Sequence, residues 1–503
     1  MRITFNLNSL FGKIEYLVIF IGVALVIIAN KSGVGLSWDS TDYMAVGRNM
    51  ASGHGTLDVT GLPMTVRPPG VPALICVGDW LSLSPNSTFL IINALSAGIS
   101  IYFTMRILNE AGVRRSILLP TLIVVALSPS LLNMYSMAWS EPIFIALVMS
   151  ALWIALFPRR FIVQISLGLI FTAMFFVRYV GPFFSLPIAI VSALIYSKRS
   201  SLINSTFKSG SIFFLSLIPQ YFWLMRNKGI DGTLTGVRTG AGGSYFQPIK
   251  TMIATYGSWI IGHDPMNGTG GIYLSWNDYS FAMKILGLVF ASAILCLVAM
   301  MFLKFRALES VRVALSLFFV AFFYMAFSVI RYVHAEIGPL DSRMMIGVYI
   351  PLLLTFAIGL QSLASSKVPQ KLLLFFFVCL VSSFGAQSIW NSITYGNQGR
   401  YWASKVHQSQ PLHAFVKALD ANSQFMSNEP QMLYSVVKSS PIYNQYMNER
   451  QFPRQCTERF MIWYATSYLP EAKPIGGEVL YSDALGEVIK LSNCSTPAST
   501  FWP

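Results

Sequence analysis

Long apolar runs separated by short polar connections dominate this chain. A helix needs about 20 apolar residues to cross the hydrocarbon core of a bilayer. The pattern predicts about eleven such helices, centred on residues 15–31, 88–108, 116–135, 141–158, 161–178, 182–197, 210–226, 280–304, 311–331, 343–363 and 371–390. Only 11% of the residues are charged and 54% are hydrophobic, whereas soluble domains carry about 25% charged residues. The pattern therefore predicts a polytopic α-helical membrane bundle.

Basic residues mark every second connection between these runs. They are Lys13, then Arg106, Arg114 and Arg115, then Arg159 and Arg160, then Lys198, Arg199 and Lys208, then Lys304, Arg306 and Arg312, then Lys367 and Lys371. Because positively charged connections stay on the cytoplasmic side, we expect the N-terminus inside and the C-terminus outside. The net charge of +14 is spread over these helix ends, so nucleic-acid binding is not expected.

Three long segments fall on the outer side in this arrangement: residues 32–87, 227–279 and 391–503. They hold most of the acidic residues and four of the five histidines, and the fifth, His334, falls in another outer connection, so we expect any chemistry on the extracytoplasmic face. Residues 1–390 are predicted to form a transmembrane module and residues 391–503 a small soluble α/β domain. In that tail we expect helices at Pro411–Asp420 and 430–437, and strands at 424–428, 460–464 and 487–491.

Two features of the outer segments leave alternatives open. The segment 227–279 is rich in glycine and is either a mobile lid over a site or a flexible connector. Cys456 and Cys494 lie in the polar tail; they form a disulfide if the tail is extracytoplasmic, or they remain free thiols.

Two carboxylates, Asp39 and Asp42, follow the first apolar run in the stretch Trp38-Asp39-Ser40-Thr41-Asp42-Tyr43. Acids at this boundary must be solvated or paired, because burying an unpaired charge is costly. The stretch is either an ordinary polar loop or part of a site. Asp42 by itself is also explained as an acid at a helix N-terminus, where the helix dipole favours it.

The first outer segment resembles that of polytopic glycosyltransferases of the GT-C class. The likeness rests on Asp39 to Tyr43, on Arg48-Asn-Met-Ala-Ser-Gly53, on Gly61 and on Arg67-Pro68-Pro69. It is nearest to the protein O-mannosyltransferase and lipid A aminoarabinose transferase families, and the plan of eleven helices with an external tail extends it over the whole chain. The resemblance implies that a sugar passes, with inversion, from a polyprenyl-phosphate donor to an acceptor.

In this resemblance, Asp39 takes the position of the general base, which removes a proton from the acceptor hydroxyl. Many family members carry Asp-Glu where this chain has Asp39-Ser40, so whether Asp42 shares or takes the role stays open. Glu141, in Ser140-Glu141-Pro142, resembles the second acid, which orients the acceptor or helps to hold a divalent ion. Its alternative explanation is an acid in the first turn of a helix.

Cationic side chains must neutralise the charge of a lipid-phosphate leaving group. Arg67 and Arg343 are the leading candidates by their position in the resemblance. Weaker candidates are Arg331, Arg226 and Arg178, because an arginine at a helix end also snorkels to the membrane interface.

The resemblance also bears on the other ligands. We expect the acceptor or the sugar to contact Tyr43, Arg48 or His263. A divalent cation would need several oxygen ligands, which could come from Asp39, Asp42, Glu141 and Asp264. The aminoarabinose transferase has an acid-Lys-Pro pattern where this chain reads Val66-Arg67-Pro68, so the acidic metal ligand of that pattern is missing here. We therefore expect no required cofactor, and the binding of a divalent cation stays an open alternative.

The sequence therefore predicts a glycosyltransferase of the bacterial inner membrane, with its site facing the periplasm. Its partners would be a polyprenyl-phosphate-linked sugar, membrane lipid, and a glycan, lipid or protein acceptor. One alternative is an O-antigen polymerase or ligase that uses a glycan on a lipid diphosphate and needs no acid in the first outer segment. A transporter or flippase is disfavoured, since the predicted spans carry almost no charge at mid-depth.

Overall fold

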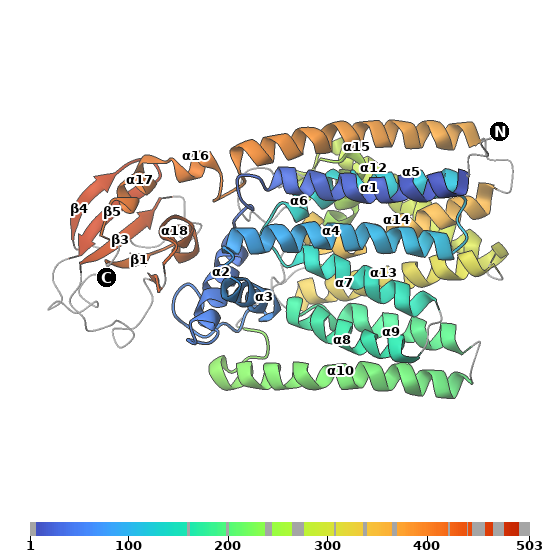
Figure 1. Cartoon of the computed structure of the whole chain (residues 1–503), viewed down its shortest axis with the longest axis horizontal. Helices are drawn as coiled ribbons and strands as arrows, with labels where there is room; N and C mark the ends of the chain where they lie inside the picture. Colours follow the sequence, from blue (N-terminus) through green and yellow to red (C-terminus); the bar gives the residue numbers. More distant parts are fainter. Residues whose placement is uncertain are drawn as a thin grey trace, which may run out of the picture.

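In the computed structural model, helices lie side by side in an elongated bundle, and a small sheet lies beyond one end (Figure 1). The structure describes residues 7–157, 161–197, 201–236, 244–263, 276–305, 308–334, 340–364, 370–420, 423–439, 441–444, 458–465 and 477–491. The helices of the bundle and its outer end are α1 (Leu7–Ala29), α2 (Trp38–Ala51), α3 (Gly70–Trp80), α4 (Pro85–Glu110), α5 (Arg115–Ala126), α6 (Pro129–Tyr135), α7 (Glu141–Leu156), α8 (Phe161–Val177), α9 (Pro182–Tyr196), α10 (Leu202–Asp231), α11 (Phe246–Ile261), α12 (Phe281–Met300), α13 (Glu309–His334), α14 (Ser342–Ala364) and α15 (Gln370–Gln398).

Four helices are long and apolar enough to cross a membrane, counted over the described residues: α4, α12 with the turn that follows it, α13 and α14. The predicted run 116–135 is two helices, α5 and α6, bent by 43°. The break falls where Ser128 caps α6 by accepting a hydrogen bond from the Leu131 amide, and Pro129 fills the first helical position, where a missing N–H costs nothing. The bent pair makes a fifth span if it is counted as one.

The first outer segment contains two helices instead of an irregular loop. The side chain and amide of Ser37 and the side chain of Ser40 form a capping box that starts α2, and this places Asp39 in the first turn. The helices α2 and α3 approach closely at Gly47, where an added Cβ would lie 2.6 Å from Cβ of Ile75. The carboxylates of the first segment therefore stand on a rigid, packed element.

The segment 227–279 is also partly helical. The helix α10 continues to Asp231, and α11 occupies residues 246–261. Glycine lets α11 pack against α12, because an added Cβ at Gly257 or Gly287 would lie within 2 Å of a backbone oxygen of the other helix. The predicted segment thus contributes one helix, α11, which packs antiparallel to α12. The remaining glycine-rich residues of the lid hypothesis, 237–243 and 264–275, lie outside the described residues.

The tail after α15 folds around a five-stranded sheet. Its elements are α16 (Lys405–Gln408), α17 (Pro411–Lys417), β1 (Gln424–Ser427), α18 (Pro430–Val437), β2 (Tyr443–Asn444), β3 (Arg459–Tyr464), β4 (Glu478–Ser482) and β5 (Gly486–Leu491). The strand order is β2-β1-β3-β5-β4, with β1 parallel to both neighbours and β5 antiparallel to both of its own. Five of these elements, α17, α18, β1, β3 and β5, overlap the ranges predicted from the sequence, whereas α16, β2 and β4 were not predicted. Cys456 and Cys494 lie outside the described residues.

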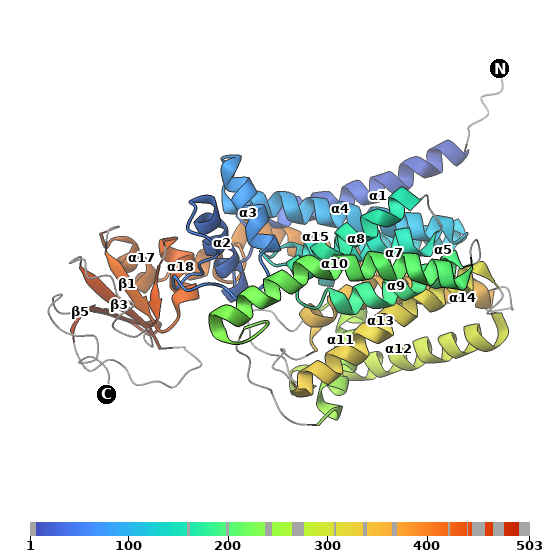
Figure 2. The same cartoon turned by 90° about the horizontal axis from the view of Figure 1, so that it is seen from below.

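The tail is attached to the first outer segment. Figure 2 shows α18 beside α2, at the end of the bundle away from the N-terminus. The backbone amide of Ile442 donates to the carbonyl of Val59 at 2.9 Å, and Arg48 donates to the carbonyl of Lys438 at 3.0 Å. These contacts hold the tail against α2, the helix that carries Asp39, and against the loop that follows it.

Candidate active site

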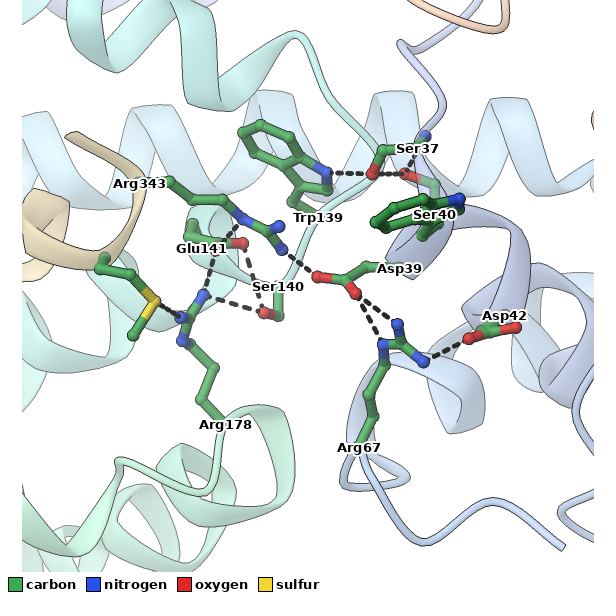
Figure 3. A network of polar contacts seen from close by, with 12 residues as sticks. Ser37, Asp39, Ser40, Asp42, Arg67, Trp139, Ser140, Glu141, Arg178 and Arg343 are labelled. Carbon is green, nitrogen blue, oxygen red and sulfur yellow. Dashed lines mark hydrogen bonds and ion pairs between the residues drawn. The ribbon is translucent and has the colours of Figure 1, made fainter. Parts of the chain in front are cut away.

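Six charged side chains form one continuous row, with acids and arginines alternating (Figure 3). The order is Asp42, Arg67, Asp39, Arg343, Glu141 and Arg178. Asp39 lies at the centre: its Oδ1 accepts from Nε of Arg67 at 2.7 Å, and its Oδ2 pairs with Nη2 of Arg343. Nε of Arg343 donates to Oε1 of Glu141 at 2.6 Å. The network joins groups that the sequence places in five separate segments.

Helix ends and the first outer segment position these groups. Asp39 and Asp42 are three residues apart on α2, so both face the same side of the helix, where Arg67 pairs with each of them. Arg67 precedes α3 by three residues. Glu141 and Arg343 stand in the first turns of α7 and α14, and Arg178 directly follows α8. Charges are thereby gathered where several apolar helices begin or end.

The electrostatics of the two aspartates differ. Burial opposes the ionisation of Asp39, but Arg343 and Arg67 together outweigh it and hold the pKa of this carboxyl below its usual range. For Asp42, burial raises the pKa to about 7; the charge of Arg67 and a hydrogen bond with Gln431 only partly offset this, and the charges of Asp58 and Asp39 raise the pKa further. Asp39 is therefore an anion at neutral pH, whereas Asp42 changes its charge near neutrality.

Aromatic and hydroxyl side chains fix the network. The guanidinium of Arg343 lies 4.2 Å from the ring centre of Trp139, a cation–π contact. The indole N–H of Trp139 donates to Oγ of Ser37 at 2.7 Å, which links this aromatic ring to the capping box of α2. Tyr43 hydrogen-bonds Ser140, and burial raises the pKa of Tyr43 to about 12, so it stays protonated.

A cavity of about 800 Å³ opens beside the network. Its polar wall includes Asp39, Arg67, Arg178 and Arg343. Much of the remaining lining is apolar or aromatic, and comes from α8, α9, α10, α13 and the turn between α8 and α9: Phe175, Val180, Phe183, Leu217, Tyr221, Leu224 and Phe327. The cavity thus combines charged and apolar lining, and we call the part lined by these seven residues its apolar arm.

The structure separates the remaining predicted residues into two groups. Tyr43 and Arg331 line the cavity, and Arg331 makes no hydrogen bond or ion pair with any residue that the structure describes. Arg226 instead donates to the carbonyl of Met64 at 2.8 Å, and Arg48 holds the tail as noted above. His263 is exposed just after α11. Arg226, Arg48 and His263 are not among the residues that line the cavity.

Arg178 is the residue that sequence reasoning undervalued. Its Nη1 pairs with Oε1 of Glu141, and its side chain is only 13% exposed. It follows an apolar run, as interfacial arginines do, and the sequence offers no signal that separates the two cases. Only the packing of α8 beside α7 brings it to the acid.

Each carboxylate of the network forms an ion pair with at least one guanidinium group. Among the described residues, no group of three or more His, Cys, Asp or Glu side chains is placed to hold a metal ion. Asp264, the fourth ligand considered from the sequence, lies outside those residues. Arginines, three of them in the network and Arg331 in the cavity wall, are instead the abundant ligands, and guanidinium groups suit phosphate.

Comparisons with known proteins establish the fold. No protein-family model and no curated protein matches the sequence. The structure matches that of ArnT from Cupriavidus metallidurans bound to undecaprenyl phosphate, with a TM-score of 0.61 and 11% identity, over 96% of this chain and 99% of that chain. It also matches the Archaeoglobus fulgidus oligosaccharyltransferase, with a TM-score of 0.50 and 10% identity, over 90% of this chain and 68% of that chain. Both are GT-C glycosyltransferases, so this chain has the GT-C fold, which confirms the resemblance seen in the sequence.

Proposed function

We propose that this protein is a membrane glycosyltransferase that moves a sugar from a polyprenyl-phosphate donor to an acceptor hydroxyl, with inversion, at the outer end of its helical bundle. The observation that carries this proposal is the ionic row centred on Asp39. It places a carboxylate and several arginines together on the wall of a cavity with an apolar arm. The GT-C fold supports the same class of reaction.

Asp39 is the general base in this proposal. As the acceptor oxygen attacks the anomeric carbon, its proton must leave, and a carboxylate within hydrogen-bond distance takes it. The low pKa of Asp39 keeps it ionised, but it also makes the free site a weak base. A carboxylate offers about four lone-pair positions. Asp39 can therefore accept a hydrogen bond from the hydroxyl of the acceptor substrate while it still binds an arginine.

The arginines hold the donor phosphate. The bond from phosphate to the anomeric carbon breaks, and the negative charge left on phosphate is stabilised by guanidinium groups. A phosphate that draws Arg67 or Arg343 away from Asp39 removes part of the attraction that lowers the pKa of this carboxyl. Donor binding would then strengthen the base. Arg331 on the cavity wall supplies a further cation.

The apolar arm accepts the lipid. Residues of α9, α10 and α13 line this arm, and many side chains on the outer surface of α10 are exposed and apolar, including Leu215, Ile218 and Phe222. An isoprenoid chain can therefore leave the cavity into lipid without exposing apolar surface to water. We expect the tail, which packs on α2, to hold or select the acceptor.

Mass spectrometry of the lipid that co-purifies with the full chain, together with a transfer assay, tests the proposal. We expect a polyprenyl monophosphate, bare or carrying one sugar, and release of bare polyprenyl monophosphate during turnover. A polyprenyl diphosphate that carries an oligosaccharide would contradict the proposed donor and favour a glycan polymerase or ligase. An Arg67→Gln, Arg343→Gln double variant is the control, and it should lose the lipid.

A further inference from the structure

The helix α10 presents a narrow buried stripe to the rest of the bundle. Between residues 210 and 231, four of its side chains are buried: Phe213, Ser216, Gln220 and Asn227. Its other faces are largely exposed and apolar. Two amide side chains therefore stand seven residues apart, or about 10 Å along the axis, on the same inward stripe of one helix.

These two amides have opposite hydrogen-bonding states. The nitrogen of Asn227 donates to Tyr179 Oη at 3.0 Å and to the carbonyl of Leu234 at 3.1 Å, and its oxygen accepts from Arg226 at 2.9 Å. Gln220 is only 3% exposed, yet its Nε2 has no partner among the residues that the structure describes. A buried amide without a partner costs about 1–3 kcal/mol, and a ligand that pairs with the amide of Gln220 would recover this cost.

Gln220 lines the same cavity as the arginines, and its depth is set by two neighbouring contacts. Ser216, one turn before it, accepts through its carbonyl a hydrogen bond from Thr172 on α8. Trp223, three residues after it, donates to Tyr179 Oη at 3.0 Å. Gln220 therefore lies level with Phe175 and Phe176, which precede Arg178 by two to three residues, or about 3–4.5 Å along the helix axis.

We propose that Gln220 is a specificity-determining residue that hydrogen-bonds a ring hydroxyl of the sugar on the lipid-linked donor. This proposal rests on the proposed function. A side-chain amide has an NH₂ group that donates hydrogen bonds and an oxygen that accepts them. A sugar hydroxyl both donates and accepts hydrogen bonds, so it can pair with either group of the amide. A phosphate oxygen only accepts, and the four arginines on the cavity wall and in the ionic row already suit it better. An isoprene unit offers neither group.

Binding of a matched pair of lipids to the full chain in nanodiscs tests this proposal. The probes are undecaprenyl phosphate alone and undecaprenyl phosphate that carries mannose, glucose, arabinose or aminoarabinose. For Gln220→Leu we expect about 3- to 10-fold weaker binding of the preferred sugar lipid, the effect of one or two neutral hydrogen bonds, and unchanged binding of the bare lipid. Gln164→Leu is the control: Gln164 is a buried glutamine of α8 that does not line the cavity, and its change should leave both affinities unaltered.

Thermal unfolding separates binding from folding. Leucine is close in volume and removes the unpaired amide, so we expect Gln220→Leu to melt at the same or a higher temperature than the wild type while it binds the sugar lipid less well. Equal loss for bare and sugar-bearing lipid would overturn the sugar assignment in favour of phosphate. Equal affinity of wild type and variant for the preferred sugar lipid would refute any ligand role for Gln220. If the wild type prefers no sugar lipid over the bare one, both this assignment and the proposed function are wrong.

Discussion

Asp39 and Arg343 stand 304 positions apart in the sequence and form an ion pair at the centre of the ionic row. Asp39 lies in the first turn of α2, and Arg343 in the first turn of α14. The pair joins the first outer segment to the late part of the bundle, beside the cavity. The first two predictions concern its two members.

Replacement of Asp39 by asparagine should reduce sugar transfer by about 10²- to 10⁴-fold, the usual contribution of a general base. Asparagine keeps the size and one acceptor oxygen but cannot take the proton. The measurement is kcat/KM with the co-purified donor, alongside the melting temperature of each protein. Asp79→Asn, at an exposed position on α3, serves as the control. Activity within threefold of the wild type would remove Asp39 from the chemistry.

Arg343→Lys should lose about 10- to 100-fold in kcat/KM, although it keeps the positive charge. The guanidinium contacts Asp39 through Nη2 and Glu141 through Nε at the same time, and it stacks on Trp139. An ammonium group is a point charge and cannot reproduce this fork. A lysine variant with wild-type kinetics would show that charge alone is needed here.

Arg178→Gln tests the arginine that the sequence did not separate from an interfacial anchor. Without it, Glu141, which is buried, keeps Arg343 as its remaining partner in the row, so we expect lower transfer and a lower melting temperature. Arg106→Gln is the matched control, because Arg106 forms a more exposed pair with Glu110, and such pairs contribute about 0–1 kcal/mol. Similar behaviour of the two variants would argue against a role for Arg178 at the site.

The raised pKa of Asp42 predicts a pH-dependent stability. The carboxyl titrates at about 7 in the folded protein, against an ordinary value of 3.8. Between these values the folded state holds a proton that the unfolded state has released, so the stabilisation is complete below pH 4 and is lost as the pH rises to 7. The melting temperature of Asp42→Asn relative to wild type should therefore rise from pH 4 to 7 and level off above it. A difference that falls over this range would show that Arg67 controls the ionisation of Asp42.

The contact between the tail and α2 should influence catalysis. The indole N–H of Trp38 donates to Oε2 of Glu429 at 3.2 Å, and Trp38 neighbours the proposed base. Glu429→Gln retains an acceptor oxygen and should keep most activity, whereas Glu429→Leu should lower kcat several-fold with little effect on binding of undecaprenyl phosphate. Glu458→Gln, at an exposed pair with Lys490, is the control. Equal kcat values for the Gln and Leu variants would contradict this coupling.

Much of the site was visible in the sequence because a family pattern marked it. Asp39, Asp42, Arg67, Glu141 and Arg343 were all predicted as site residues, and the structure brings all five into one ionic row. Their roles stay predictions. Nothing in the sequence indicated a functional role for Gln220, because a single glutamine in an apolar run does not differ from an incidental polar residue.

The sequence by itself indicated the long apolar helices, because hydrophobic runs of sufficient length act locally, but it did not indicate α3 or α11 in the outer segments. In the tail it indicated α17, α18, β1, β3 and β5 close to where they occur. The tertiary structure decided that α11 packs on α12 and that Arg178 reaches Glu141. Those outcomes depend on which helices become neighbours. Ion pairs and close glycine contacts act over a few ångströms between residues that lie far apart in the chain, so no local pattern specifies them.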